Sequence, residues 1–282
     1  MSALADTLAR IRAEGRPALV GYLPAGFPDK QTAIDAMVAM VEGGVDIVEI
    51  GLPYSDPVMD GPTIQRAAEA ALRAGMRVAD VFDTVEAVAA TGAPTLVMTY
   101  WNPVERVGVE AFASRLAAAG GAGLITPDLI PDEAAEWIES STTHGLDRVF
   151  LVAPSSTDAR LAMTAQASSG FLYATSVMGV TGTRTATSTA APTLVERVKK
   201  VSDIPVGVGL GVSNGDQAAE VGAFADAVIV GSALVARLLD AGSDTATGIA
   251  AVRALAEDLR AGVERARTAP SVPTTADKGA LA

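Results

Sequence analysis

Two carboxylates lie near each other in the sequence, one inside an apolar run and one in the loop that follows it. Glu49 interrupts the apolar run 46–50, and Asp60 lies in a following loop that carries three prolines and two aspartates. Burial in an apolar strand disfavours the charged form of a carboxyl and raises its pKa, which suits Glu49 to proton transfer near neutral pH. Two carboxylates in different environments are a common acid–base arrangement. The pair therefore predicts proton-transfer chemistry, and a structural carboxylate bonded inside the fold is the alternative for Glu49.

Three later segments are rich in glycine, and each follows an apolar run. They are residues 179–182, 209–213 and 231–232. Glycines let backbone N–H groups approach an anion, and the N-terminus of a helix favours negative charge. One such segment alone is typical of an ordinary turn between a helix and a strand. Three in succession favour a phosphate-binding site.

The composition excludes several classes of function. Lys and Arg total 21 against 33 Asp and Glu, and the resulting net charge of −12 disfavours a nucleic-acid or anionic-membrane partner. The sequence has no cysteine and one histidine, His144, which argues against thiolate chemistry and most metal sites. No run approaches the ~20 apolar residues of a membrane span. Residues 2–16 have the spacing of an amphipathic helix and do not resemble a signal peptide, so we expect a cytoplasmic protein.

Eight short runs rich in Val, Ile and Leu alternate with helical patterns. The runs are residues 18–23, 46–50, 95–99, 123–126, 148–152, 171–174, 205–209 and 227–230. The helical patterns are residues 30–42, 63–74, 78–90, 109–119, 131–142, 157–167, 193–201 and 213–221. Apolar runs without polar alternation are typical of parallel strands buried on both faces. Eight strands, each followed by helix, predict an α/β fold of the (β/α)8 barrel type. A doubly wound open sheet uses the same alternation, but the glycine motif of dinucleotide binding does not follow the first run.

The expected barrel forms one domain that places the chemistry at a single mouth. We expect a catalytic domain over residues 1–267, closed by a long helix at 243–267, and a disordered tail at 268–282. In such barrels the active site lies at the carboxyl ends of the strands and in the loops that follow them. Both carboxylates and the glycine segments follow predicted strands, so they are expected at the same mouth.

The segment from Val48 to Gln65, which reads VEIGLPYSDPVMDGPTIQ, resembles the signature of the tryptophan synthase alpha chain family. The resemblance extends to residues 179–182, 209–213 and 231–233, in the order in which the family has them. It implies a barrel that cleaves indole-3-glycerol phosphate to indole and glyceraldehyde 3-phosphate by a retro-aldol reaction in tryptophan biosynthesis. It also implies a beta chain as partner in an alpha2–beta2 complex. Pyridoxal phosphate is then expected only in that partner, and no cofactor or metal in this chain.

The resemblance also implies roles for individual residues. Glu49 resembles the family's essential acid–base group and Asp60 its partner at the indole nitrogen, while Tyr173 is similar to the tyrosine that supports the glutamate. Tyr100, after the third strand, resembles a further residue of the substrate site. The residues similar to the family's phosphate cradle are Gly182, Gly211, Gly231 and Ser232. The residues expected at the interface with the beta chain are Pro53, Asp56 and Asn102, and Pro53, Tyr54 and Asp56 are expected to be presented outward.

Two other functions fit part of the pattern. Another phosphosugar enzyme on the same barrel, such as an indole-glycerol-phosphate synthase or a phosphoribosyl isomerase, would also explain the glycine segments. Those enzymes usually need a lysine or aspartate at a strand end, and here the acid of the second strand is Glu49 and no strand ends in lysine. The third possibility is a weakly catalytic barrel retained as an activating subunit. Phe27 and Met59 stand where the family usually has an aspartate and a small residue, which leaves room for this possibility.

Overall fold

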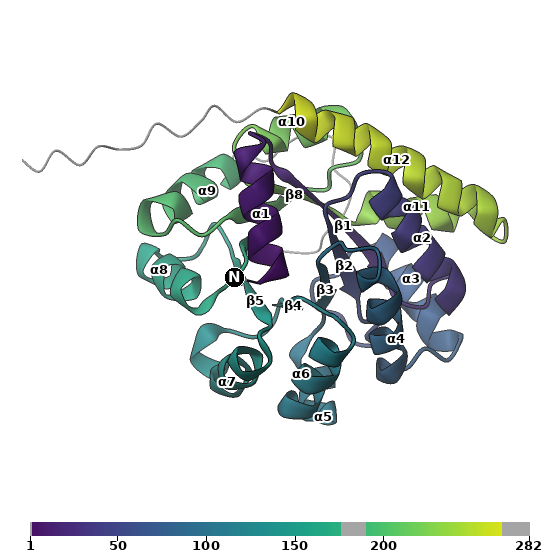
Figure 1. The fold of residues 1–282 in the computed structure, drawn as a ribbon, viewed down its shortest axis with the longest axis horizontal. Helices are drawn as coiled ribbons and strands as arrows, with labels where there is room; N and C mark the ends of the chain where they lie inside the picture. Colours follow the sequence, from purple (N-terminus) through teal and green to yellow (C-terminus); the bar gives the residue numbers. More distant parts are fainter. Residues whose placement is uncertain (1, 176–189, 267–282) are drawn as a thin grey trace, which may run out of the picture.

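Eight parallel strands close into a barrel in the order of the sequence, and β1 pairs with both β2 and β8 (Figure 1). The computed structural model describes residues 2–175 and 190–266. The strands are β1 (Ala18–Pro24), β2 (Ile47–Gly51), β3 (Thr95–Met98), β4 (Gly123–Thr126), β5 (Asp147–Val152), β6 (Leu172–Thr175), β7 (Val206–Gly209) and β8 (Ala227–Val230). Closure confirms the predicted (β/α)8 barrel and excludes the doubly wound open sheet, in which the first and last strands do not pair.

Helices surround the barrel and follow the strands along the chain (Figure 1). They are α1 (Ala3–Ala13), α2 (Lys30–Glu42), α3 (Pro62–Arg73), α4 (Val78–Ala89), α5 (Trp101–Val107), α6 (Val109–Ala118), α7 (Ala135–His144), α8 (Asp158–Ala167), α9 (Ala190–Val201), α10 (Gly215–Gly222), α11 (Ser232–Ala241) and α12 (Thr245–Arg265), with a short 3-10 turn η1 (Pro131–Glu133). The expected tail at 268–282 and the glycine segment at 179–182 lie outside the described residues.

Side chains alternate along each strand between the helices and the barrel interior, as the pleat of a strand requires. On β2, Val48 and Ile50 pack in the large cluster between the strands and the outer helices. Ile47 instead belongs to a separate inner cluster with Val20 of β1. Glu49, two residues after Ile47, therefore points into the barrel, as does Tyr22, two residues after Val20.

The amino-terminal helix α1 closes one end of the barrel. Its buried residues Leu4, Leu8 and Ile11 belong to the same inner cluster as the inward side chains of the strands. The Ser2 hydroxyl accepts the Ala5 N–H at 3.1 Å and caps the helix. Figure 1 shows α1 lying across the end of the barrel. Chemistry is thereby confined to the opposite end, where the strands finish.

The helices differ from the prediction at two places, one helix that was not expected and one that is divided. Helix α5 was not predicted, because Pro103 in the pattern Tyr100–Trp101–Asn102–Pro103 resembles a loop signal; proline is nevertheless tolerated in the first turn of a helix. The helix expected at 131–142 is divided into η1 and α7. The division occurs because Ala134 has φ −93° and ψ 13°, outside the α-helical range.

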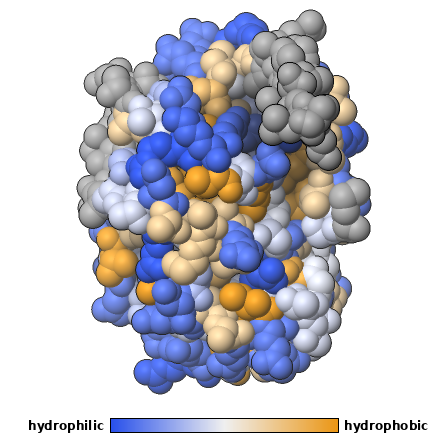
Figure 2. Space-filling view, turned by 90° about the vertical axis from the view of Figure 1, so that its left-hand side faces the viewer, coloured by the Kyte–Doolittle hydropathy of each residue, from blue (hydrophilic) through white to orange (hydrophobic). Residues whose placement is uncertain are grey.

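The outer surface mixes polar and apolar residues. Figure 2, which views the side of the barrel that carries α8 and α9 in Figure 1, shows hydrophilic residues over much of that side with apolar residues between them. In the part of the chain that the structure describes, no helix combines the length and the apolar character that crossing a membrane requires.

A buried ion cluster ties the closed end of the barrel together. Arg16 donates two hydrogen bonds to the Asp46 carboxylate, at 2.7 and 2.8 Å, and both side chains are only 6% exposed. Asp46 also accepts the Leu19 N–H at 2.9 Å and a bond from Arg260 of α12 at 3.1 Å. One carboxylate therefore links the segment before β1, the start of β2 and the last described helix.

We expect Asp46→Ala to lower the free energy of unfolding by about 3–5 kcal/mol, because it leaves the Arg16 guanidinium buried without its main partner. Urea denaturation measures this change. Arg10→Ala is the control, since the Arg10–Glu14 pair is 59% and 39% exposed and should contribute less than about 1 kcal/mol. Equal small losses in both variants would contradict a structural role for the cluster.

Candidate active site

Glu49 is a buried carboxyl without a partner. It is 1% exposed, and neither carboxyl oxygen has a hydrogen-bond partner among the described residues. Burial raises the pKa of the Glu49 carboxyl to about 8, because the charged form would lose its hydration. At neutral pH the group therefore carries a proton, and no hydrogen bond to a described residue holds it in place. Such a carboxyl is suited to donating that proton.

Two tyrosines, Tyr22 of β1 and Tyr173 of β6, reach into the barrel interior near Glu49. The Tyr22 side chain occupies the space that a Cβ on Gly51 would need: that Cβ would lie 2.5 Å from the Tyr22 Cζ and would collide with the hydroxyl. Likewise, a Cβ on Gly209 would lie 2.5 Å from the Tyr173 hydroxyl. The Glu49 charge contributes to raising the pKa of both tyrosines, after burial, which has the largest effect. Both phenols therefore stay protonated in the neighbourhood of Glu49, and neither donates a hydrogen bond to it in this structure.

Tyr22 was not predicted as a site residue. In the sequence it lies in the continuous apolar run of the first strand, where an aromatic residue is typical of the core. Its inward position depends on the register that pairs it with Glu49 across β1 and β2. The available sequence evidence was its place at the carboxyl end of a predicted barrel strand, on the same alternation as Ala18 and Val20.

Asp60 is held over the barrel mouth by Tyr100. The Tyr100 hydroxyl donates to Asp60 Oδ1 at 3.2 Å and accepts the Met59 N–H at 3.0 Å. Gln65 of α3 donates to the Asp60 carbonyl at 2.7 Å and fixes the end of the loop. Burial raises the pKa of Asp60, while the Tyr100 hydrogen bond lowers it. Asp60 thus has one oxygen held by a hydrogen bond, in contrast to Glu49, whose two oxygens have no partner among the described residues.

The rest of the loop after β2 differs from the expectation at one residue. Ser55 and Asp56 are exposed, but Pro53 is buried and is not presented outward. The reason is that the Leu52 N–H donates to the Met98 carbonyl at 2.9 Å, which extends the pairing with β3 past the end of β2 and holds the next residue inward. Asn102 is exposed on α5 and donates to the Tyr54 hydroxyl at 3.1 Å.

The phosphate candidates lie at the ends of β7 and β8. Gly211 has φ +69°, a conformation that favours glycine. Gly231 precedes α11, and no side chain caps that helix, whereas Asn214 caps the neighbouring α10. The first N–H groups of α11, beginning at the buried Ser232, are therefore not satisfied by a capping side chain, and an anion could bind them. Gly182 lies outside the described residues.

The arrangement combines a neutral acid, a second carboxylate and an uncapped helix at one end of the barrel. Among residues 2–175 and 190–266, no three His, Cys, Asp or Glu side chains are grouped so that they could hold a metal ion. The chemistry available from these residues is proton transfer to and from a bound molecule, with an anionic group anchored at α11.

Comparisons with known proteins identify close relatives. The profile of the family "Tryptophan synthase alpha chain" matches residues 8–264. The chain is similar to the tryptophan synthase alpha chain of Acidothermus cellulolyticus, with 61% identity over 94% of this chain and 98% of the relative. It is also similar to the tryptophan synthase alpha chain of Mycobacterium avium, with 63% identity over 92% of this chain and 93% of the relative. Among solved structures, a chain of Mycobacterium tuberculosis tryptophan synthase superposes with a TM-score of 0.88 at 58% identity, covering 95% of this chain and 99% of that one.

The unpartnered acid predicts a pH-dependent stability. The folded protein keeps the Glu49 proton up to about pH 8, whereas the unfolded chain loses it near the ordinary pKa of 4.5. Between these values the folded state binds one more proton than the unfolded state. Through this group the free energy of unfolding therefore falls as pH rises, by up to about 1.4 kcal/mol per pH unit.

We expect Glu49→Gln to remove this dependence, so that the variant becomes increasingly more stable than the parent between about pH 5 and about pH 8. Urea denaturation across this range measures the difference. Glu86→Gln, at an exposed position of α4, is the matched control and should follow the parent. Parallel stability curves for Glu49→Gln and the parent would show that the carboxyl titrates normally.

Proposed function

The chain belongs to the tryptophan synthase alpha chain family, and we propose that Glu49 and Asp60 are the acid–base pair with which it acts. As an alpha chain it is a carbon–carbon lyase of tryptophan biosynthesis, which cleaves indole-3-glycerol phosphate to indole and glyceraldehyde 3-phosphate. Membership excludes the other phosphosugar enzymes that the glycine segments alone would allow. The assignment of the pair rests chiefly on one observation, the buried and unpartnered Glu49 carboxyl.

The cleavage requires three events at the substrate. Indole is a poor leaving group as a carbanion, so ring carbon C3 must accept a proton before the bond to the glycerol chain breaks. The hydroxyl on the adjacent carbon loses its proton as the aldehyde forms. The ring nitrogen carries positive charge in between, until the bonding electrons return to the ring and restore indole.

Glu49 supplies the proton to C3 in this proposal, and its carboxylate then accepts the hydroxyl proton. A pKa of about 8 supports the first role, because the group is protonated at neutral pH. Asp60 faces the ring N–H and stabilises its positive charge, and Tyr100 orients it through the bond to Oδ1. Groups that move protons in this way typically contribute ~10²–10⁴-fold each. Tyr173 supports Glu49 from β6.

Phosphate binding holds the substrate in register with the acid. We assign this role to Gly211, Gly231 and Ser232, together with Gly182. The uncapped N-terminus of α11 supports the assignment, since helix N–H groups and the helix dipole both favour an anion. Binding energy from the phosphate, remote from the reacting carbon, then positions the ring over Glu49.

A pyridoxal-phosphate-dependent beta chain is the proposed partner, in an alpha2–beta2 complex, and this chain itself uses no cofactor. The solved M. tuberculosis relatives carry the name of the whole enzyme, tryptophan synthase, which supports a complex. We place Asp56 and Asn102 at the interface, since both are exposed beside the loop that carries Asp60. A biosynthetic role also favours a location in the cytoplasm. The catalytic domain in this proposal is formed by residues 1–267.

We expect Glu49→Gln to reduce cleavage by at least ~10²-fold, because the amide has no proton to donate to C3. Asp60→Asn should also lose most activity, since the amide cannot balance the positive charge at the ring nitrogen. Indole release from indole-3-glycerol phosphate measures both, with circular dichroism as a check on folding and Glu86→Gln as the control. A Glu49→Gln protein with parental turnover would overturn the assignment.

A beta chain should raise cleavage by at least ~10-fold, by shifting the loop that carries Asp60 toward its working position. Titrating beta chain against the cleavage rate measures this activation. Asp56→Ala should lower the ratio of the rates with and without beta chain, because Asp56 is exposed on the same loop and its carboxylate accepts a hydrogen bond from the neighbouring Ser55 hydroxyl. A flat titration for the parent, with complex formation shown independently, would refute activation through the loop.

A further inference from the structure

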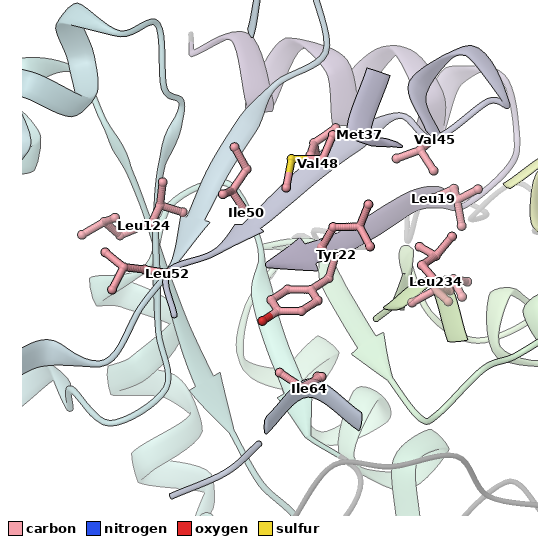
Figure 3. Close-up of a cluster of buried hydrophobic side chains, with 14 of the residues drawn as sticks. Leu19, Tyr22, Met37, Val45, Val48, Ile50, Leu52, Ile64, Leu124 and Leu234 are labelled. Atoms are coloured by element: carbon pink, nitrogen blue, oxygen red, sulfur yellow. The ribbon is translucent and has the colours of Figure 1, made fainter. Parts of the chain in front are cut away.

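The Tyr22 hydroxyl lies on the path between the barrel mouth and Glu49. Glu49 and Gly51 point to the same inner face of β2, and Gly51 is one step nearer the mouth. The Tyr22 hydroxyl fills the space that the missing Gly51 side chain leaves on that face. In Figure 3 the Tyr22 hydroxyl points away from Leu19 and Val45. A molecule that reaches Glu49 from the mouth therefore passes this hydroxyl.

The Tyr22 hydroxyl lies near two acceptor atoms that lack a donor. Tyr22 is 8% exposed, and both Glu49 carboxyl oxygens are without a hydrogen-bond partner among the described residues. The charges of Asp60 and Glu49 both act on it, so it lies within electrostatic range of the two carboxylates. Its pKa is raised well above the ordinary value, chiefly by burial, so the phenol is a donor throughout the working pH range.

We propose that Tyr22 is a positioning residue that donates a hydrogen bond to the Glu49 carboxylate once Glu49 has given up its proton. Both Glu49 oxygens are unpartnered among the described residues, and this costs the neutral acid less free energy than it would cost the carboxylate. The ionised Glu49 carboxylate, inside the barrel and away from water, needs a hydrogen-bond donor. Among the described residues, Glu49 acts electrostatically on Tyr22 of β1 and Tyr173 of β6, whereas β3 places the apolar Leu96 opposite it. Toward the mouth lie Asp60 and Tyr100, which bond each other.

This inference rests on the proposed role of Glu49 as the acid. It assigns Tyr22 a different task from filling the pocket, which the ring alone would accomplish. Tyr22→Phe separates the two, because it keeps the ring and its fit against Gly51 and removes only the donor. Loss of the donor destabilises the carboxylate relative to the neutral acid and so raises the pKa of Glu49.

We expect Tyr22→Phe to raise the Glu49 pKa by about one pH unit in the free protein. Carboxyl ¹³C NMR measures this pKa, with the Glu49 resonance assigned by its loss in Glu49→Gln. Cleavage of indole-3-glycerol phosphate should show kcat lowered roughly 10-fold, KM changed little, and the pH profile of kcat/KM moved in the same direction.

Tyr54→Phe is the matched control, since it removes a phenol that bonds Asn102 and does not face Glu49; it should leave the Glu49 pKa unchanged. An unchanged Glu49 pKa and an unchanged pH profile in Tyr22→Phe would overturn the inference and leave the ring as packing. The NMR titration does not depend on turnover. An active Glu49→Gln protein would therefore refute the catalytic role of Glu49 while the coupling to Tyr22 is still decided by the titration.

Discussion

A carboxyl buried without a partner is the constraint on which the active end of this barrel depends. Ionised Glu49 would lack both hydration and donors within the described residues, so the fold keeps it neutral and raises its pKa. That placement is unfavourable at alkaline pH and would not persist on a flexible loop. Glu49 lies on β2, paired to Tyr22 of β1 and Leu96 of β3, and the strand pairing fixes it. Rigid pairing is therefore what makes a reactive acid possible here.

The two ends of the barrel have different tasks: the closed end stabilises the fold, and the open end carries the groups proposed to act on the substrate. At the closed end, Asp46 is fully bonded to Arg16, Arg260 and a backbone N–H, and the apolar face of α1 covers the interior. At the open end, polar groups are left with unused bonding capacity, as at Glu49 and at the uncapped start of α11. Groups that a stable core would satisfy are thus kept free where a substrate could satisfy them.

The sequence predicted the barrel well because its evidence is local: eight continuous apolar runs alternate with eight helical patterns. It predicted Glu49 and Asp60 for the same reason, since each follows or interrupts a predicted strand. It missed α5, where proline in the first helical turn resembles a loop, and it placed Pro53 outward although a backbone bond between Leu52 and Met98 holds it in. It also missed Tyr22, whose inward direction and fit against Gly51 depend on strand register. Contacts between distant segments are what a single sequence leaves undetermined.

The order of the strands explains how a phosphate and two carboxylates could share one barrel end. β1 lies between β2, which carries Glu49, and β8, which leads to Gly231 and α11. The Tyr22 ring spans this interval: its Cδ1 lies 3.3 Å from the position of a Cβ on Gly231, while its hydroxyl fills the space beside Gly51. A neutral phenol on β1 thus separates the proposed phosphate site from the acid. In the proposed mechanism Glu49 is also neutral when substrate binds, so the phosphate would meet little negative charge on that side, and the carboxylate would form only after the substrate is anchored.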